Sequence, residues 1–459
     1  MRLFTRRNSL VGVAALSAAA LTLAGCAADD NGGTTTTGSG DGGTTAAAGC
    51  EAYADFLGHE GSTVEIYTTI IEPESLVFQE SFLEFEECTG ITIEWNGDQA
   101  FEEQIAVRVA GGTAPDLAIF PQPGLMASFV SDMVPASAAL EASVDANYSP
   151  DMKIYGTIDG TFYAPPLGSN VKSWVWHSPQ VFAENGWDIP TTWDELLALS
   201  DEIAASDFEG TAWCAGIESG VATGWVVTDW MEDLMLRVHG VDVYDAWVDN
   251  SMPFNDERVL QVLTEAGKIL KNPDFVGNVP AIATTNFFDG AAGLADGTCA
   301  MHRQASFLGG VLVSDYGATL VSPEDTDVDG GVAVFYFPGV STDSTPVLFA
   351  GEFMAAFSDD PAVDAVQRYL TSAEWNNAKA ALGGWLSAHL SLDTNLIDDP
   401  VNKASVELLQ DTSNPLRFDA SDLMPGAVGA GSFWREMTAW IAEDKDGQTA
   451  LDAIQATWP

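Results

Sequence analysis

The chemistry that the sequence marks most plainly is the modification of one cysteine. Leu23-Ala24-Gly25-Cys26 ends an apolar stretch that begins at Leu10, and three arginines precede that stretch. A basic start, an apolar middle and a small-residue cleavage site are typical of an export leader, and the apolar stretch is too short to span a bilayer. We expect residues 1–25 to be a lipoprotein signal peptide and Cys26 to carry the lipid. The processed chain would then be extracytoplasmic and anchored to the cell membrane.

Motifs for catalysis give one weak match. The sequence has no GxSxG elbow, no HExxH, no Walker A motif and no GxGxxG after a strand. Ser169-Asn170-Val171-Lys172 fits the SxxK nucleophile pattern, but the SDN and KTG elements that accompany it are missing, so we interpret it as a chance match. Close carboxylate pairs are inevitable among 67 acidic residues and are no evidence for glycoside hydrolysis. We expect no catalytic residue, and a lipid-anchored hydrolase remains the alternative.

Four further cysteines, Cys50, Cys88, Cys214 and Cys299, make an even number in an oxidising compartment. None belongs to a CxxC or a close Cys/His cluster, so two disulfides are a better interpretation than a metal site, and we expect no metal and no cofactor. Three connectivities are possible. We favour Cys50 with Cys88 and Cys214 with Cys299, because each pair lies within one half of the chain; the other two stay open.

The charge excludes one class of partner. The formal net charge is −50, and the predicted leader holds three of the 17 basic residues and no acidic one. Binding to phosphates needs clustered Lys and Arg, so we expect no nucleic-acid partner. The acidic residues are spread along the chain, which favours a strongly solvated surface.

Aromatic side chains in polar surroundings give the positive signal. Most of the 14 tryptophans are expected in the core, but Trp225 follows Thr223-Gly224, and Trp434 follows Gly431-Ser432-Phe433. Their neighbours are small, so these rings are available to a cleft. A flat apolar ring beside amide, carboxylate and guanidinium groups suits a sugar.

The elements that must position these residues alternate between strand and helix. Residues 63–67 and 91–95 alternate like strands, 117–120 form an apolar strand, and Phe78, Phe82 and Phe85 have helical spacing. Helix starts are marked by the capping box Thr192-Trp193-Asp194-Glu195 and by Asp360-Pro361. This order predicts an α/β fold with parallel strands. Residues 26–50, a run of Gly, Thr, Ala, Ser and Asp after the lipidated cysteine, predict a flexible stalk.

Taken together, several segments resemble the carbohydrate-binding lipoproteins of ABC importers, the solute-binding family that includes maltose-binding protein. The most specific are residues 111–120, 175–179, 190–196 and 296–301. Residues 120–124, 302–307 and 418–426 are similar to the branch that binds α-glucosides. Phe120 stands where maltose-binding protein has a tryptophan, which argues against maltose itself.

The resemblance implies two α/β lobes joined by a hinge, with a sugar bound between them and closure by hinge bending. It places lobe 1 at residues 51–166 plus 339–380 and lobe 2 at residues 167–338 plus 381–459. It implies a monomer that binds an α-glucoside or a related di- or oligosaccharide and delivers it to the transmembrane permease. The sugar-facing positions that it implies are Glu72, Phe120, Gln122, Trp225, Arg303, Gln304 and Trp434.

Two other solutes fit less well. Iron favours clustered Tyr or His, which the sequence lacks. A polyamine would suit the acidic composition but not Arg303 at the cleft. We therefore favour a sugar.

Overall fold

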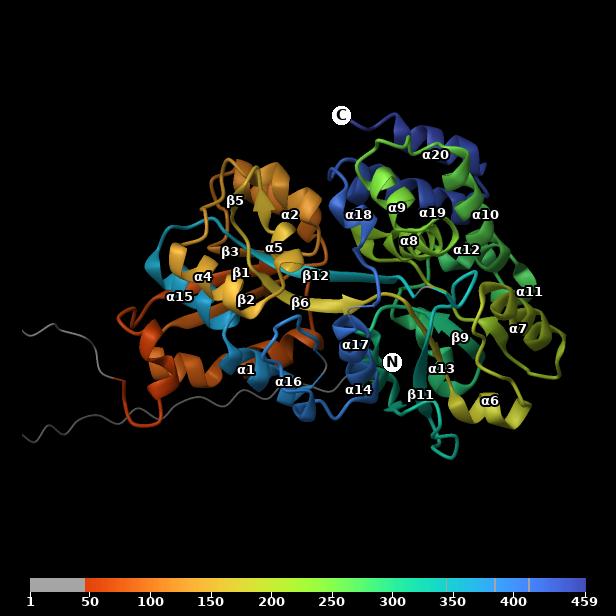
Figure 1. The fold of residues 1–459 in the computed structure, drawn as a ribbon, viewed down its shortest axis with the longest axis horizontal. Helices are drawn as coiled ribbons and strands as arrows, with labels where there is room; N and C mark the ends of the chain where they lie inside the picture. The colour runs from red at the N-terminus through yellow and green to blue at the C-terminus, as the bar shows by residue number, and fades with distance from the viewer. Residues whose placement is uncertain (1–45, 344, 384, 412) are drawn as a thin grey trace, which may run out of the picture. The chain divides into compact units, whose positions relative to one another are not determined.

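The computed structural model describes residues 46–459 except 344, 384 and 412. The predicted leader, Cys26 and most of the predicted stalk lie outside the described residues. The described chain is a mixed α/β protein built on two main sheets (Figure 1). Both sheets carry the parallel pairs that the alternating sequence predicts, and both also contain antiparallel pairs.

The first sheet has the strand order β13-β12-β3-β1-β2, and β6 also pairs with β12. Its strands β1, β2 and β3 are parallel neighbours that follow one another in sequence, whereas β12 runs antiparallel to β3 and to β6. The carboxyl ends of β1, β3 and β6 therefore face the same edge. The strands are β1 Thr63–Thr68, β2 Thr92–Gly97, β3 Leu117–Phe120, β6 Pro166–Val171, β12 Val347–Ala356 and β13 Leu416–Phe418.

The second sheet has the order β10-β11-β7-β9-β8. Strand β7 lies between two antiparallel partners, β11 and β9, and β8 pairs parallel with β9. The strands are β7 Trp174–His177, β8 Thr211–Trp213, β9 Cys299–Arg303, β10 Thr319–Leu320 and β11 Gly331–Tyr336. A separate two-stranded hairpin consists of β4 Thr157–Ile158 and β5 Thr161–Phe162.

Helices cover the sheets. Those whose side chains join the cores of the first sheet are α1 Glu74–Thr89, α2 Phe101–Ala110, α4 Ala138–Asn147, α15 Pro361–Leu370 and α16 Ala373–Leu382. Those whose side chains join the cores of the second sheet include α6 Pro179–Asn185, α7 Trp193–Ala205, α8 Trp225–His239, α9 Val241–Val248, α10 Glu257–Leu270, α14 Leu308–Tyr316, α17 Pro400–Gln410, α19 Trp434–Ala442 and α20 Gly447–Gln455. Shorter helices used below are α3 Pro123–Met126, α13 Gly293–Asp296 and α18 Ala420–Leu423.

The first sheet is buried on both faces. Leu117 and Ile119 pack with α1 and α15 on one side, while Ala118 and Phe120 pack with α2 and α4 on the other. The whole of β3 is therefore apolar, as expected for a central strand between helical layers. The helix predicted from Phe78 and its neighbours is confirmed as α1, and the capping box at Thr192 is confirmed at the start of α7.

Three stretches of chain connect strands of the first sheet with elements beside the second. Residues 172–173 join β6 to β7, residues 337–346 join β11 to β12, and Asp419 joins β13 to α18. Two disulfides, Cys50–Cys88 and Cys214–Cys299, have the connectivity favoured from the sequence. Among the described residues, no helix is both long enough and apolar enough to cross a membrane.

Candidate ligand-binding cavity

A cavity of about 200 Å³ opens at the edge where β1, β3 and β6 end. Loops that follow the carboxyl ends of strands supply much of its lining, as is general for ligand sites in α/β proteins. Residues 69–74 follow β1, Pro121 and Gln122 follow β3, and Lys172 follows β6. Further lining comes from the start of α2, the middle of β12, α18 and the segments around Trp225, Phe287, Phe307 and Trp434.

One part of the lining is aromatic. The ring centroids of Trp225 and Phe287 lie 5.2 Å apart, those of Phe287 and Phe288 lie 4.0 Å apart, and Phe307 lies 6.1 Å from both Trp225 and Phe288. Trp434 begins α19, and its indole N–H donates to Ser421 Oγ at 3.4 Å. Such rings offer flat apolar faces that can stack on a ligand.

The polar part of the lining is acidic. Its carboxylates are Glu72, Glu74, Glu102, Glu352, Asp419 and Asp422. Burial raises the pKa of Glu74 to about 7, although the attraction of Lys379 opposes this, and burial together with repulsion from Glu74 raises the pKa of Glu352 to about 7. Burial also raises the pKa of Glu102 and, together with repulsion from Asp419, raises that of Asp422 far more. The cavity therefore contains carboxyl groups that can gain or lose a proton and can accept hydrogen bonds from a ligand.

Lys172 is the one basic side chain among the described lining residues. Its ammonium donates to Asp229 at 3.0 Å and to Asp419, and it lies 5.1 Å from the ring centroid of Trp225. Burial alone would lower its pKa, but the attraction of Asp229 and Asp419 outweighs that effect and holds the pKa well above its usual value. Lys172 is therefore charged and already bound to two carboxylates.

A buried charge network extends from Lys172 away from the cavity. Arg303 donates to Asp229 at 3.3 Å and to Asp233, and Arg237 donates to Asp233 at 2.6 Å. Glu232 accepts the backbone N–H groups of residues 420 and 421 at 3.1 Å. The network links α8 and β9 to the segment after β13, so it ties together elements of both sheets. These charged side chains can be buried because they are paired with groups of opposite charge.

Three of these carboxylates, on Asp229, Glu232 and Asp419, lie close enough together to meet a metal ion. Within the described chain they form the only group of that kind. The ammonium of Lys172 bonds two of them and supplies the positive charge that an ion would otherwise bring.

Four of the seven positions implied by the resemblance line the cavity: Glu72, Gln122, Trp225 and Trp434. Gln122 is 5% exposed, and its amide donates to Glu102 at 3.1 Å. The lipidation of Cys26 concerns a residue outside the described chain.

The structure places the other three positions elsewhere. Phe120 is fully buried at the end of β3 and packs edge-on against Phe101 at 5.2 Å, because β3 has core on both faces. Arg303 is held by Asp229 and Asp233 in the interior, so its guanidinium is neutralised there. The Gln304 side chain is fully buried and accepts the N–H of Ala305 at 2.8 Å. None of these residues lines the cavity.

Sequence reasoning missed several lining residues. In the sequence, Lys172 belongs only to a chance SxxK match, and Asp419 and Asp422 belong only to a segment that resembles the α-glucoside branch. Phe287 and Phe288 lie between polar residues, much as Trp225 follows small and polar ones, and the same pattern predicts that they line a cleft. Nothing in the neighbouring sequence distinguishes Glu102 and Glu352 from the many other acidic residues of the chain.

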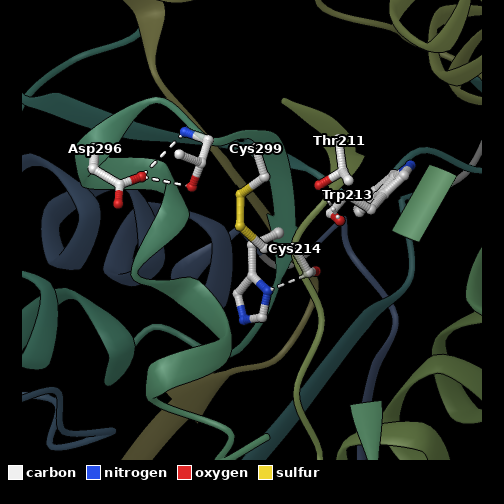
Figure 2. Close-up of a disulfide and its surroundings, with 7 residues drawn as sticks. Thr211, Trp213, Cys214, Asp296 and Cys299 are labelled. Carbon is white, nitrogen blue, oxygen red and sulfur yellow. Dashed lines mark hydrogen bonds between the residues drawn. A yellow bond between two sulfur atoms is a disulfide. The ribbon is translucent and has the colours of Figure 1, made fainter. Parts of the chain in front are cut away.

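The disulfide Cys214–Cys299 supports two of the lining segments (Figure 2). It joins the end of β8 to the start of β9. From Cys214 the chain runs on to Trp225, and Phe287 and Phe288 precede α13, where a Cβ added to Gly293 would lie 2.9 and 3.0 Å from the two sulfurs. His302 Nδ1 lies 3.0 Å from the carbonyl oxygen of Cys214 and so joins β9 to the residue that follows β8.

Comparison with known proteins gives consistent matches. Residues 71–377 match the family described as bacterial extracellular solute-binding protein. The osmoprotective compounds-binding protein GgtB of Synechocystis sp. is 39% identical over 86% of this chain and 92% of its own. The alpha-glucosides-binding periplasmic protein AglE of Rhizobium meliloti is 34% identical over 87% of this chain and 88% of its own. The maltose-bound MalE3 structure of T. maritima superposes with a TM-score of 0.67 at 17% identity, covering 86% of this chain and 98% of that one.

Proposed function

The chain belongs to the family of bacterial extracellular solute-binding proteins, and we propose that it is the receptor of an ABC importer for an α-glucoside or a related di- or oligosaccharide. Members of this family bind solutes rather than transform them, and we extend this to the present chain as a protein without catalytic activity. The names of the two relatives support a glucoside or another osmoprotective solute.

The observation that carries the proposal is the division of the cavity lining. Aromatic rings form one part of it and hydrogen-bonding side chains form the other. A pyranose ring has apolar faces and a rim of hydroxyl groups, and each buried hydroxyl without a partner costs a few kcal/mol. A ring stacked on Trp225 or Trp434 would turn its rim towards residues such as Gln122 and Asn170.

The remaining parts of the proposal follow from the sequence. Lipidation of Cys26 would anchor a monomeric receptor beside its permease. Lobe 1 would comprise residues 51–166 plus 339–380, and lobe 2 residues 167–338 plus 381–459, with the sugar between them. Strands β6 and β13, which these bounds assign to lobe 2, pair with β12 in the first sheet, so a hinge is best placed in the segments that directly follow them, residues 172–173 and Asp419.

The test is a titration of the purified protein with trehalose, sucrose and maltose, followed by tryptophan fluorescence and melting temperature. We expect saturable binding of at least one of them, recovered intact. Cleavage of the recovered sugar would instead identify a hydrolase.

A matched pair of variants locates the site. Trp225 and Trp458 are both partly buried and pack against the same core, but only Trp225 lines the cavity. Trp225→Leu should weaken sugar binding at least about tenfold, whereas Trp458→Leu should leave it unchanged. Equal effects of the two substitutions would contradict the placement of the site.

A further inference from the structure

Two buried oxygen atoms at the cavity lack hydrogen-bond partners. The amide N–H of Gln122 donates to Glu102 Oε1 at 3.1 Å, which leaves Gln122 Oε1 and Glu102 Oε2 as buried atoms without a partner. Gln122 is 5% exposed, so its oxygen has little access to bulk water. Buried polar atoms are normally satisfied, and exceptions need an explanation. Both atoms belong to residues that line the cavity, so a ligand is the natural partner.

Other acceptors reach the same cavity from a different element. Asp422 lines it from α18 and is 5% exposed. Burial raises its pKa well above the usual value, and repulsion from Asp419, Asp229 and Glu102 adds to this effect. The repulsion from Glu102 means that the carboxyl groups of α2 and α18 act on one another. This end of the cavity therefore brings together carboxyl groups whose ionised forms a bound cation would stabilise.

No free cation among the described lining residues balances these acceptors. Lys172 is committed to Asp229 and Asp419. Arg303, which the resemblance implied at the cleft, is locked to Asp229 and Asp233 in the interior. Arg303 is therefore not placed to repel a cationic solute in the cavity.

The chemistry of an acceptor-rich site distinguishes between ligand groups. A hydroxyl group donates one hydrogen bond and also needs to accept, whereas an ammonium group donates three and accepts none. Hydrogen bonds between ionised partners are also about twice as strong as neutral ones. An ammonium group thus satisfies Gln122 Oε1 and Glu102 Oε2 more completely than a hydroxyl group does.

We propose that the cavity takes an amine-bearing glycoside, whose protonated amino group is held by Glu102, Gln122 and Asp422 while its sugar ring stacks on the aromatic lining. This inference rests on the proposed function, because it adds a cationic group to a sugar ligand. The ammonium restores the positive charge that Lys172 and Arg303 do not provide.

Proton linkage gives the inference a second signature. Asp98 acts on the carboxyl group of Glu102, and Asp419, Lys172 and Asp229 act on that of Asp422. Burial keeps the pKa of Glu102 and Asp422 raised in the free protein, and a bound cation favours their ionised forms. Binding of an amine that is already protonated in solution therefore releases protons from the protein, and its affinity increases with pH until the amine itself begins to lose its proton. A neutral sugar needs no such release.

The test compares trehalose with trehalosamine, in which one hydroxyl group is replaced by an amino group, and includes spermidine. Calorimetry near neutral pH, in two buffers of different ionisation enthalpy, gives affinity and proton release together. We expect trehalosamine to bind at least about tenfold more tightly than trehalose, with proton release. Equal or tighter binding of trehalose would overturn the inference and leave the proposed function standing.

Glu102→Gln and Glu103→Gln form the matched pair of variants, since they are neighbours on α2 and the Glu103 side chain is exposed. Glu102→Gln should abolish the preference for the amine, and Glu103→Gln should keep it; equal effects would refute the assignment. The buffer comparison on the unaltered protein decides the question even if Glu102→Gln fails to fold. Binding of spermidine, with no binding of trehalosamine or of the three neutral sugars, would overturn the proposed function; binding of sucrose or maltose without trehalosamine would overturn only the inference.

Discussion

Replacing Lys172 by methionine tests the buried charge network most directly. The Lys172 side chain is 9% exposed, and its partners Asp229 and Asp419 are at most 1% exposed. Methionine keeps the apolar stem but removes the ammonium, so two carboxylates lose a buried cation. Arg303 still serves Asp229 at 3.3 Å, and the N–H of Asp422 serves Asp419 at 3.0 Å. Removing one partner of a buried pair costs about 3–5 kcal/mol of the free energy of unfolding, and we expect a loss in that range.

Urea unfolding near neutral pH measures the effect, with Lys153→Met as the control. Lys153 also bonds two carboxylates, Glu141 at 2.8 Å and Asp145 at 2.7 Å, but these partners are 45% and 57% exposed. Exposed pairs contribute up to about 1 kcal/mol. A loss at Lys172 no larger than that at Lys153 would refute the view that the network is held by its buried cation.

The pH dependence of the Lys172→Met variant has a definite sign. With Lys172 present the pKa of Asp229 is about 7, already above its unfolded-state value, and it rises further without the ammonium; Asp419 loses the attraction to Lys172 that holds its pKa below the usual value. A group with a raised folded-state pKa binds protons more readily when folded, so its stabilising contribution is present at low pH and is lost as the pH rises. The deficit relative to the unaltered protein should therefore be largest above pH 7 and shrink on acidification.

Three further outcomes are expected. Replacing Cys214 and Cys299 by serine removes the cross-link that closes a loop of 85 residues. The entropy gained by the unfolded chain lowers the free energy of unfolding by about 4.6 kcal/mol, which urea unfolding should show. Calorimetry should also show weaker ligand binding, because the disulfide holds two segments of the cavity wall together. Burial lowers the pKa of His177 and of His302 to about 4. Each therefore contributes up to about 3 kcal/mol to the free energy of unfolding, in full above its unfolded-state pKa and progressively less as the pH falls towards 4. NMR titration should show that both imidazole rings of the folded protein stay unprotonated down to about pH 4. Alanine at Gly429 would place its Cβ 1.7 Å from the carbonyl oxygen of Ser421, a residue that lines the cavity. Gly429→Ala should therefore displace the segment around Ser421 and abolish ligand binding in the titration. The control Gly431→Ala, whose Cβ would lie 3.1 Å from its nearest atom, should retain binding.

Local features were predictable because their partners lie nearby in sequence. The hydroxyl of Thr192 accepts the N–H of Glu195 three residues on, and the alternating and helical patterns of the first sheet need no distant information. Trp225 and Trp434 were predicted from their small sequence neighbours, and both line the cavity although Trp434 is only 3% exposed. The fold family followed from the order of such segments.

Long-range features were not predictable in the same way. Arg303 is neutralised by Asp233, which lies 70 residues earlier in the sequence, so its type and local surroundings were compatible with a cleft as well as with a core. Phe120 ends a strand of four apolar residues, and nothing in such a run tells which side chains meet a ligand. Glu102 and Glu103 are identical in type, and only the tertiary structure turns one to the cavity and the other to solvent.

The pairing of β12 with β3 and β6 also constrains the order in which the chain can fold. Strands β1, β2 and β3 are made early and can associate with one another, but β3 has an unpaired apolar edge until residues 347–356 have been synthesised. A growing chain therefore displays an adhesive strand edge while residues 121–346 are being made, which is the situation in which nascent proteins aggregate. The last segments of the polypeptide, not the first, close the first sheet, so a product truncated before β12 should require protection by a chaperone.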